Sequence, residues 1–302
     1  MDRPYILHMF TPARQMSPFD VNMAADAGYQ IIVPYSEVGL DAVAAMTQDT
    51  VYSRGLKGLA RTGIFIGGRD ALLAADMLDA ARAAMAPPFV VSLMADPSGA
   101  YTTAAALVAC VDATLQRTQG AGLYGRRLLV LGGSGPVGRV AGVIAALAGA
   151  RVALCTRGGQ AAADEAARQT GARFGVVLQG VSVADRAALH AALAEAEVVL
   201  ACAAAGVQVL ADADLAHAPR LCVVADVNAV APAGIAGVGV MDDGKPLPGS
   251  PALGIGALAV GNVKYQTQHR LLLRLRESDK PQLLGFPEAY AAARDCLAEK
   301  AA

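Results

Sequence analysis

The 302-residue chain contains no tryptophan, and only 5% of its residues are aromatic. It also has almost no net charge, because 25 basic side chains are balanced by 26 acidic ones. Such a balance provides no general attraction to nucleic acid or to an anionic membrane surface, so we expect neither as a partner. Apolar runs such as residues 140–150 are too short to span a bilayer, which needs about 20 residues.

Cysteine and histidine are scarce and scattered. The five cysteines form no C-x-x-C pair, and none of the four histidines lies at ligand spacing from them. This pattern favours buried thiols in a reducing compartment over a metal centre. The chain does not begin with a charged segment followed by a long apolar one, so we expect a soluble, cytoplasmic protein. Its length suggests two domains.

A glycine fingerprint lies near the middle of the chain. The apolar run 126–131 is followed by a glycine-rich turn and then by a helical pattern over 139–148. The spacing G-x-G-x-x-G is typical of a dinucleotide site, where the diphosphate lies on the helix N-terminus. The alternative is a purely structural turn, but the next apolar run, 151–155, completes a βαβ unit. The candidate contacts are Gly133, Ser134, Gly135, Pro136, Val137 and Gly138.

The end of the following strand indicates which nucleotide is bound. NAD-binding domains usually carry an acidic residue there, on the ribose 2′-hydroxyl. This chain has Cys155-Thr156-Arg157-Gly158-Gly159 instead. Thr156 and Arg157 can bind a 2′-phosphate and no carboxylate repels it, which favours NADP, with NAD as the alternative. In the simpler interpretation, Arg157 is only a solvated charge.

The rest of the chain alternates between strand-like and helical patterns, which predicts α/β architecture in both halves. Expected strands are 5–10, 30–33, 63–66, 89–94, 198–201 and 221–226; expected helices are 19–28, 40–48, 70–85, 102–119, 161–170, 184–194, 212–217, 256–277 and 287–300. Residues 230–256, rich in glycine and proline, are predicted to be a loop. We therefore expect two Rossmann-like open-sheet domains, one formed by 1–100 with about 270–302, the other by 101–269.

Ligands of open α/β sheets bind beyond the carboxyl ends of the strands, which selects a small set of candidates. Each has a simpler interpretation: Phe19 as core, Thr103 as a helix cap, Asp226 and Asn228 as an Asx-turn, Lys264 as a solvated charge and His269 as an interfacial ring. No Ser/His/Asp arrangement or metal-ligand cluster stands out. A redox reaction carried by the cofactor would suit this absence.

Several separated motifs together resemble the NAD(P)-dependent methylene-tetrahydromethanopterin dehydrogenases of methylotrophic bacteria. The likeness extends over nearly the whole chain. The motifs are Tyr5-Ile6-Leu7-His8-Met9, Ser17-Pro18-Phe19-Asp20-Val21-Asn22, Gly63-Ile64-Phe65-Ile66-Gly67-Gly68, Asp96-Pro97 with Thr102-Thr103, Asp226-Val227-Asn228-Ala229, and Gly254-Ile255-Gly256 through Gly261-Asn262-Val263-Lys264-Tyr265-Gln266-Thr267-Gln268-His269-Arg270.

The resemblance implies hydride transfer from methylene-tetrahydromethanopterin to NAD(P)⁺ during formaldehyde oxidation. It also implies two α/β domains around a deep cleft, with the pterin on the first, and a homo-oligomer such as a homotrimer. The family's active-site residues correspond to Phe19, Thr103, Lys264 and His269. Two other functions stay open at this point: a methylene-tetrahydrofolate dehydrogenase, and a protein that senses NADP without turnover. Tyr52 and Lys57 have the wrong spacing for cyclohydrolase activity.

Overall fold

The computed structural model of the protein describes residues 3–301, which form two compact units. The first unit contains the chain up to Thr102 together with Tyr265–Ala292. The second contains Thr103–Lys264 together with the chain from Ala293 onward. Within residues 3–301, every helix is too short or too polar to cross a membrane.

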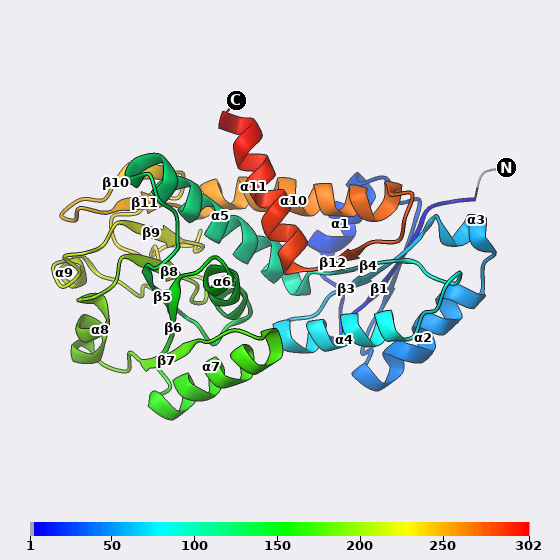
Figure 1. Cartoon of the computed structure of the whole chain (residues 1–302), viewed down its shortest axis with the longest axis horizontal. Helices are drawn as coiled ribbons and strands as arrows, with labels where there is room; N and C mark the ends of the chain where they lie inside the picture. Colours follow the sequence, from blue (N-terminus) through cyan, green and yellow to red (C-terminus); the bar gives the residue numbers. More distant parts are fainter. Residues whose placement is uncertain (1–2, 302) are drawn as a thin grey trace. The chain divides into compact units, whose positions relative to one another are not determined.

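The first unit is built on a five-stranded sheet in the order β12-β4-β3-β1-β2, with every strand pair parallel. The crossover direction reverses between β1 and β3, as in the flavodoxin-like order 2-1-3-4-5. Figure 1 shows α2 and α4 on one face of the sheet and α1 with α10 on the other. The elements are β1 (Ile6–Phe10), α1 (Pro18–Asp26), β2 (Ile31–Tyr35), α2 (Leu40–Tyr52), α3 (Leu56–Leu59), β3 (Thr62–Ile66), α4 (Ala71–Ala83), β4 (Ser92–Ala95), a 3-10 turn (Pro97–Gly99) and β12 (Leu283–Leu284).

Local sequence explains why these elements form where they do. All five residues of β3 are buried, because helices cover both faces of a parallel sheet and a central strand must be apolar throughout. The carboxylate of Asp70 accepts hydrogen bonds from the N–H groups of Leu72 and Leu73 and so caps α4. Pro18 is the first residue of α1, and the side chain of the N-cap residue Ser17 makes no capping hydrogen bond.

The second unit has a seven-stranded sheet in the order β10-β11-β9-β8-β5-β6-β7. All pairs are parallel except β10 with β11, and the order from β7 to β11 is that of dinucleotide-binding domains. The elements are β5 (Arg127–Leu131), α6 (Pro136–Leu147), β6 (Arg151–Thr156), α7 (Gln160–Phe174), β7 (Gln179–Ser182), α8 (Arg186–Leu193), β8 (Val198–Ala201), α9 (Asp212–Leu215), β9 (Val223–Asp226), β10 (Asp243–Pro246) and β11 (Leu253–Ile255).

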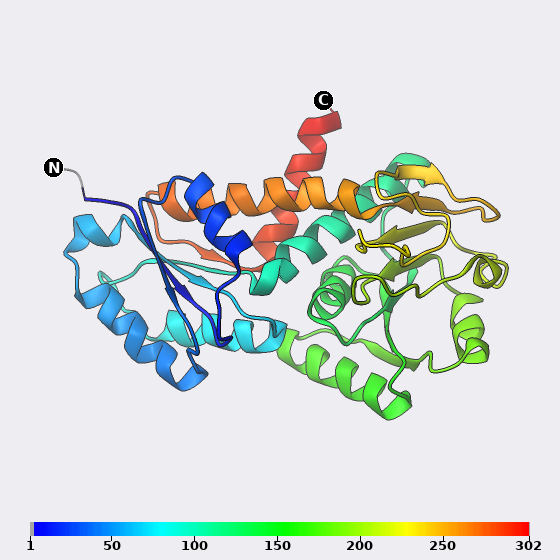
Figure 2. The ribbon, with the colours of Figure 1, turned by 180° about the vertical axis from the view of Figure 1, so that it is seen from behind.

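Three helices run across the divisions between the units: α5 (Ala100–Gln119), α10 (Ala257–Glu277) and α11 (Phe286–Ala301). Within the first unit, α10 lies beside α1 in both ribbon views (Figures 1 and 2). There the amide of Gln268 donates to the carboxylate of Asp20 at 2.8 Å, and both side chains are buried. This hydrogen bond joins residues 248 positions apart in the sequence.

One prediction was wrong. Residues 230–256, expected to be a loop, contain β10 and β11. These strands are only four and three residues long, and β11 is held by its ladder to β9, in which Gly254 pairs with Val224. Because both strands are so short, and because β11 pairs with β9 through residues such as Leu253 and Val223 that are distant in sequence, no local periodicity marks them.

Candidate functional site

The glycine-rich loop is folded so tightly that side chains are excluded from it. Gly132 has φ of +83°, and a Cβ there would lie 2.7 Å from the backbone of Cys202 and Ala203. A Cβ on Gly133 would lie 2.8 Å from Cα of Leu154, and one on Gly138 would lie 2.5 Å from the carbonyl oxygen of Gly132. The glycines therefore let the loop lie against β6 and the end of β8, as a dinucleotide cradle requires.

Helix α6 starts directly from this loop. Gly135 is its N-cap residue and Pro136 its first residue. The first N–H groups of a helix have no acceptor within the helix, and the helix dipole favours an anion at this end. The loop and helix together can therefore hold a diphosphate.

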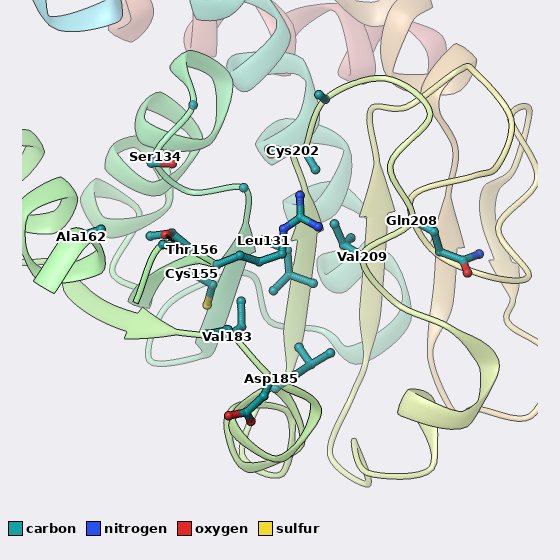
Figure 3. Close-up of a pocket in the computed structure, with 18 of the residues that line it drawn as sticks. Leu131, Ser134, Cys155, Thr156, Ala162, Val183, Asp185, Cys202, Gln208 and Val209 are labelled. Carbon is teal, nitrogen blue, oxygen red and sulfur yellow. Dashed lines mark hydrogen bonds between the residues drawn. The ribbon is translucent and has the colours of Figure 1, made fainter. Parts of the chain in front are cut away.

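A cavity of about 730 Å³ opens beyond the carboxyl ends of β5, β6, β7 and β8 (Figure 3). It contains four of the predicted cofactor contacts: Ser134, Gly135, Thr156 and Arg157. Gly133 and Gly138 do not line it but shape the loop from behind. Further lining residues follow β7 and β8, among them Asp185, Arg186, Cys202, Ala203 and Ala204. The contribution of β7 was missed, because the polar segment Gln179–Ser182 was not recognised as a strand.

The groups expected near a ribose 2′-substituent lie at the end of β6. The hydroxyl oxygen of Thr156 accepts a hydrogen bond from the N–H of Gly158 at 2.9 Å, which leaves its proton to donate. The side chain of Arg157 is exposed and makes no ion pair with any residue in 3–301. The nearby carboxylate of Asp185 caps α8 by accepting from the N–H of Ala188. Position 157 is therefore free to bind an anionic ligand.

A network of charged and aromatic side chains supports the rim of the cavity at α8. The side chain of Asp214 is 2% exposed, and its carboxylate accepts from Arg186 and from His190, whose ring stacks on that of His217. Burial opposes ionisation of Asp214, but hydrogen bonds from the N–H of Ala211 and from His190 and Arg186 outweigh it and lower the pKa of Asp214. The ion pair holds Arg186 in place beside the cavity.

Two thiols line the same cavity. Burial raises the pKa of Cys155 and of Cys202 to about 12 in each case. Thiols with such pKa values stay protonated at neutral pH and are poor nucleophiles. The cavity can therefore bind a ligand without offering it a covalent partner.

Asp226 and Asn228 face their own loop. The Asp226 carboxylate, 2% exposed, accepts from the N–H groups of Asn228 and Ile235. The Asn228 side chain accepts from Gly206 N–H at 3.1 Å and donates to the carbonyl of Pro232 at 2.8 Å. The bond from the N–H of Asn228 to the carboxylate of Asp226, two residues earlier, is the Asx-turn that the sequence left open as an alternative. Because Gly206 follows the cavity-lining segment after β8, Asn228 also helps to hold that segment.

In the first unit, Phe19 lies near the start of α1. Its side chain is 46% exposed, so it is not part of the core. His269 follows Gln268 on α10, and its ring stacks on that of Tyr265 with centroids 6.5 Å apart. The Asp20–Gln268 hydrogen bond therefore joins the two helices that carry Phe19 and His269.

Thr103 and Lys264 belong to the second unit. From Gly99 to Asp112 every residue except Thr103 is buried, so α5 has a single partly exposed position in this stretch. Lys264, half-buried, lies one helical turn before Gln268 on α10. Both side chains are therefore partly accessible.

Comparison with known proteins gives consistent matches. Residues 18–98 match the family described as methylene-tetrahydromethanopterin dehydrogenase, N-terminal. The chain is 47% identical over 285 residues to the NAD(P)-dependent methylenetetrahydromethanopterin dehydrogenase of Methylorubrum extorquens, covering 94% of this chain and 96% of that protein. It is 35% identical over 278 residues to the bifunctional protein MdtA of the same organism, covering 91% and 93%.

Solved structures confirm the two-domain α/β fold. Shikimate 5-dehydrogenase from Listeria monocytogenes, in complex with shikimate and NAD, is similar with a TM-score of 0.51 at 16% identity, over 97% of this chain and 96% of that chain. Ligand-free 5-ketofructose reductase of Gluconobacter gives 0.51 at 15% identity, over 97% and 99%. At these identities the likeness to the two solved structures concerns the fold alone. The likeness to the two Methylorubrum proteins is a likeness in sequence and is much closer. The chain belongs to the family of NAD(P)-dependent methylenetetrahydromethanopterin dehydrogenases.

Proposed function

We propose that the protein oxidises methylene-tetrahydromethanopterin to methenyl-tetrahydromethanopterin with NAD(P)⁺ in one-carbon metabolism. The observation that carries this proposal is the 47% identity over 94% of the chain to a dehydrogenase of that name. The glycine cradle, the helix N-terminus and the cavity of about 730 Å³ fit the NAD(P) that the reaction requires. When bound, the nicotinamide supplies the hydride acceptor.

The chemistry of the substrate explains why the site needs no strong acid or base. A methylene carbon between two nitrogens gives up hydride readily, because a nitrogen lone pair stabilises the resulting amidinium-type cation and no proton has to move. The protein must mainly orient the two ligands, a contribution that reaches about 7 kcal/mol or more in favourable cases. Buried, protonated thiols beside the cofactor cavity are compatible with such a reaction.

We assign pterin binding to four side chains. Phe19 offers an exposed ring for stacking, and Thr103 offers a hydroxyl at the one partly exposed position of its stretch of α5. Lys264 and His269 on α10 supply polar groups for the pterin or its acidic tail. Phe19 and His269 belong to the first unit, whereas Thr103 and Lys264 belong to the second, which also carries the proposed nucleotide site.

NADP is the proposed preferred cofactor. Arg157 has no competing ion pair within residues 3–301, and the end of β6 carries no carboxylate of its own. Arg157→Ala should raise KM for NADP⁺ by about 10-fold, equal to 1.4 kcal/mol, and leave KM for NAD⁺ within twofold. Arg151→Ala, which removes an exposed charge at the opposite end of β6, is the control. Equal loss with both cofactors would contradict the assignment.

The deciding experiment follows absorbance at the reduced-nicotinamide band with methylene-tetrahydromethanopterin and either NADP⁺ or NAD⁺. Rapid turnover supports the proposal, and the faster cofactor tests the preference. Turnover only with methylene-tetrahydrofolate would assign the protein to the folate pathway instead. Tight NADP binding with no reduction by either pterin would indicate a nucleotide sensor. We further propose a cytoplasmic homo-oligomer, whose size light scattering would measure.

A further inference from the structure

We propose that Arg139 is a positioning residue that fixes the glycine-rich loop for the cofactor diphosphate by tying it to helix α7. This inference rests on the proposed nucleotide site. Arg139 is in the second turn of α6, four residues after the N-cap residue Gly135. A positive charge near a helix N-terminus is disfavoured by the helix dipole, so Arg139 is not there to stabilise α6.

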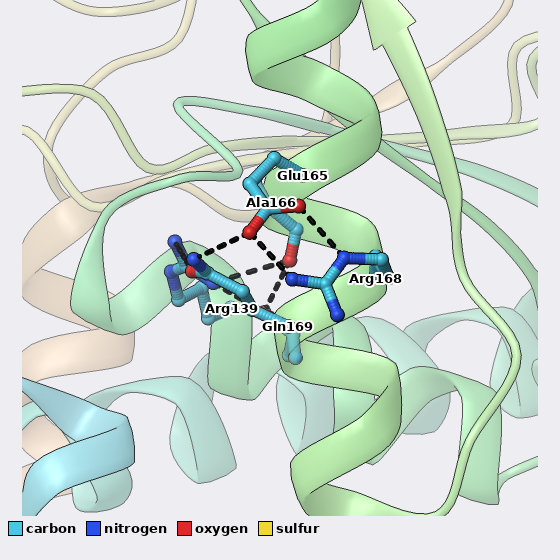
Figure 4. A network of polar contacts seen from close by, with 6 residues as sticks. Arg139, Glu165, Ala166, Arg168 and Gln169 are labelled. Atoms are coloured by element: carbon cyan, nitrogen blue, oxygen red, sulfur yellow. Dashed lines mark hydrogen bonds and ion pairs between the residues drawn. The ribbon is translucent and has the colours of Figure 1, made fainter.

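The guanidinium of Arg139 bridges the loop and α7. Its Nε–H donates to the carbonyl oxygen of Ser134, a loop residue that lines the cavity, at 3.0 Å. One terminal nitrogen donates to the carbonyl oxygen of Ala166 at 3.1 Å and to the hydroxyl of Thr170 at 2.7 Å. The other donates to the side-chain oxygen of Gln169 at 3.3 Å. Figure 4 shows the α7 side of this network.

The acceptors on α7 are themselves held in place. Thr170 is fully buried, and its hydroxyl donates to the carbonyl of Ala166 at 2.7 Å. Gln169 donates to the carboxylate of Glu165, which also pairs with Arg168. A planar guanidinium with fixed partners defines both direction and distance, which a single ammonium cannot do. Arg139, itself held by α7, therefore fixes the position of the Ser134 carbonyl oxygen.

The hydrogen bonds of Arg139 to Ser134 and to α7 form a tether between the loop and this helix. The tether is expected to affect nucleotide binding because the loop must present its N–H groups to an anion. Glycine-rich segments have the largest conformational freedom to lose, and a loop ordered before binding avoids that loss at the moment of binding. Both NADP and NAD carry the diphosphate, so the tether should act equally on the two. This pattern differs from that of Arg157, which should act on NADP alone.

The test compares dissociation constants of NADP⁺ and NAD⁺, measured by calorimetry without pterin, together with hydrogen exchange of the ligand-free loop. Arg139→Ala should weaken both nucleotides by about 10-fold and speed amide exchange over residues 132–138. Thr170→Val should change both in the same direction to a smaller extent. Arg139→Lys keeps the charge but should restore less than half of the lost affinity on a logarithmic scale. Arg151→Ala should leave both constants within twofold.

Three results would overturn the proposal: unchanged affinity in Arg139→Ala, full rescue by lysine, or weakened binding with unchanged loop exchange. The last two would mean that the charge acts on the ligand directly. If the wild-type protein bound neither nucleotide, the proposed function would fail, while the exchange measurement would still test whether Arg139 orders the loop.

Discussion

At the scale of single residues, Ser98 is held in an unfavourable conformation. Its φ of 49° and ψ of 36° lie in the left-handed region, and its hydroxyl donates to the carbonyl of Gly68 at 2.7 Å. This bond joins the segments that follow β3 and β4, where ligands bind in sheets of this order. A non-glycine residue in such a conformation costs of order 1–3 kcal/mol and is found mainly at functional sites.

Two substitutions at position 98 should separate the effect of backbone strain on stability from that of the hydrogen bond to Gly68. Ser98→Ala loses the bond and keeps the strain, so it should lower the free energy of unfolding by about 1 kcal/mol. Ser98→Gly loses the same bond but relieves the strain, so it should be more stable than the alanine variant by about 1 kcal/mol. Urea midpoints measure both. An alanine variant as stable as the glycine variant would show that the backbone is not strained.

Asp214 predicts how stability depends on pH. Its pKa in the folded protein lies below the usual 3.8, so its contribution is present above that value and is lost as pH falls through the lowered one. Asp214→Asn should therefore cost about 1–3 kcal/mol at pH 7, and the deficit should shrink below pH 4. Urea unfolding at pH 7 and pH 3.5 measures this, with the exposed Asp212→Asn as control. A deficit independent of pH would exclude the charged interaction with Arg186 and His190.

At the scale of elements, the strand–turn–helix from β5 to α6 depends on close backbone approach. In Gly138→Ala the new Cβ would lie 2.5 Å from the Gly132 oxygen and 2.9 Å from Cα of Gly133, and neither atom can yield like a side chain. We expect a loss of about 1–3 kcal/mol in stability and weaker binding of both nucleotides. Thermal unfolding and calorimetry measure the two effects.

Gly261 in α10 offers the matched control. No atom lies within 4 Å of a Cβ built there, so Gly261→Ala should stabilise the helix by up to about 1 kcal/mol. If Gly138→Ala and Gly261→Ala had the same free energy of unfolding, steric exclusion of a side chain would not explain why position 138 is glycine.

The elements also indicate what the sequence could predict. Fully apolar strands such as β8, and longer helices with local signals such as α4, lie within a few residues of their predicted bounds. Strand β7 is polar, and β12 has only two residues, held by pairing with β4 across 190 positions. Such strands are defined by their partners and leave no local pattern.

The candidate site was predictable to a similar extent. Glycine spacing predicted the tight turn between β5 and α6, because sterics alone demand glycine there. The tether from Arg139 to Thr170 spans 31 residues and has no motif. The lining residues after β7 were not predicted, because β7 itself is polar and leaves no local pattern in the sequence.

At the scale of the whole molecule, Phe19 belongs to the first unit and the glycine-rich loop to the second, so substitution of Phe19 should affect the affinity for the pterin alone. Phe19→Ala should weaken pterin binding by about 1–3 kcal/mol through lost stacking and leave the NADP dissociation constant within twofold. Calorimetric titration of each ligand alone measures this. Tyr124→Ala, which removes an exposed ring from the second unit, is the control. An unchanged pterin affinity in Phe19→Ala would remove Phe19 from the site.

The path of the chain between its two units has a consequence for recombination. Three divisions, after Thr102, Lys264 and Ala292, interrupt helices and not loops. A chimaera of two relatives joined at one point would therefore mix parents within a sheet, for instance β12 from one and β4 from the other. Exchange of the whole nucleotide-binding unit requires three junctions, so single crossovers in this family should seldom transfer cofactor preference as an intact module.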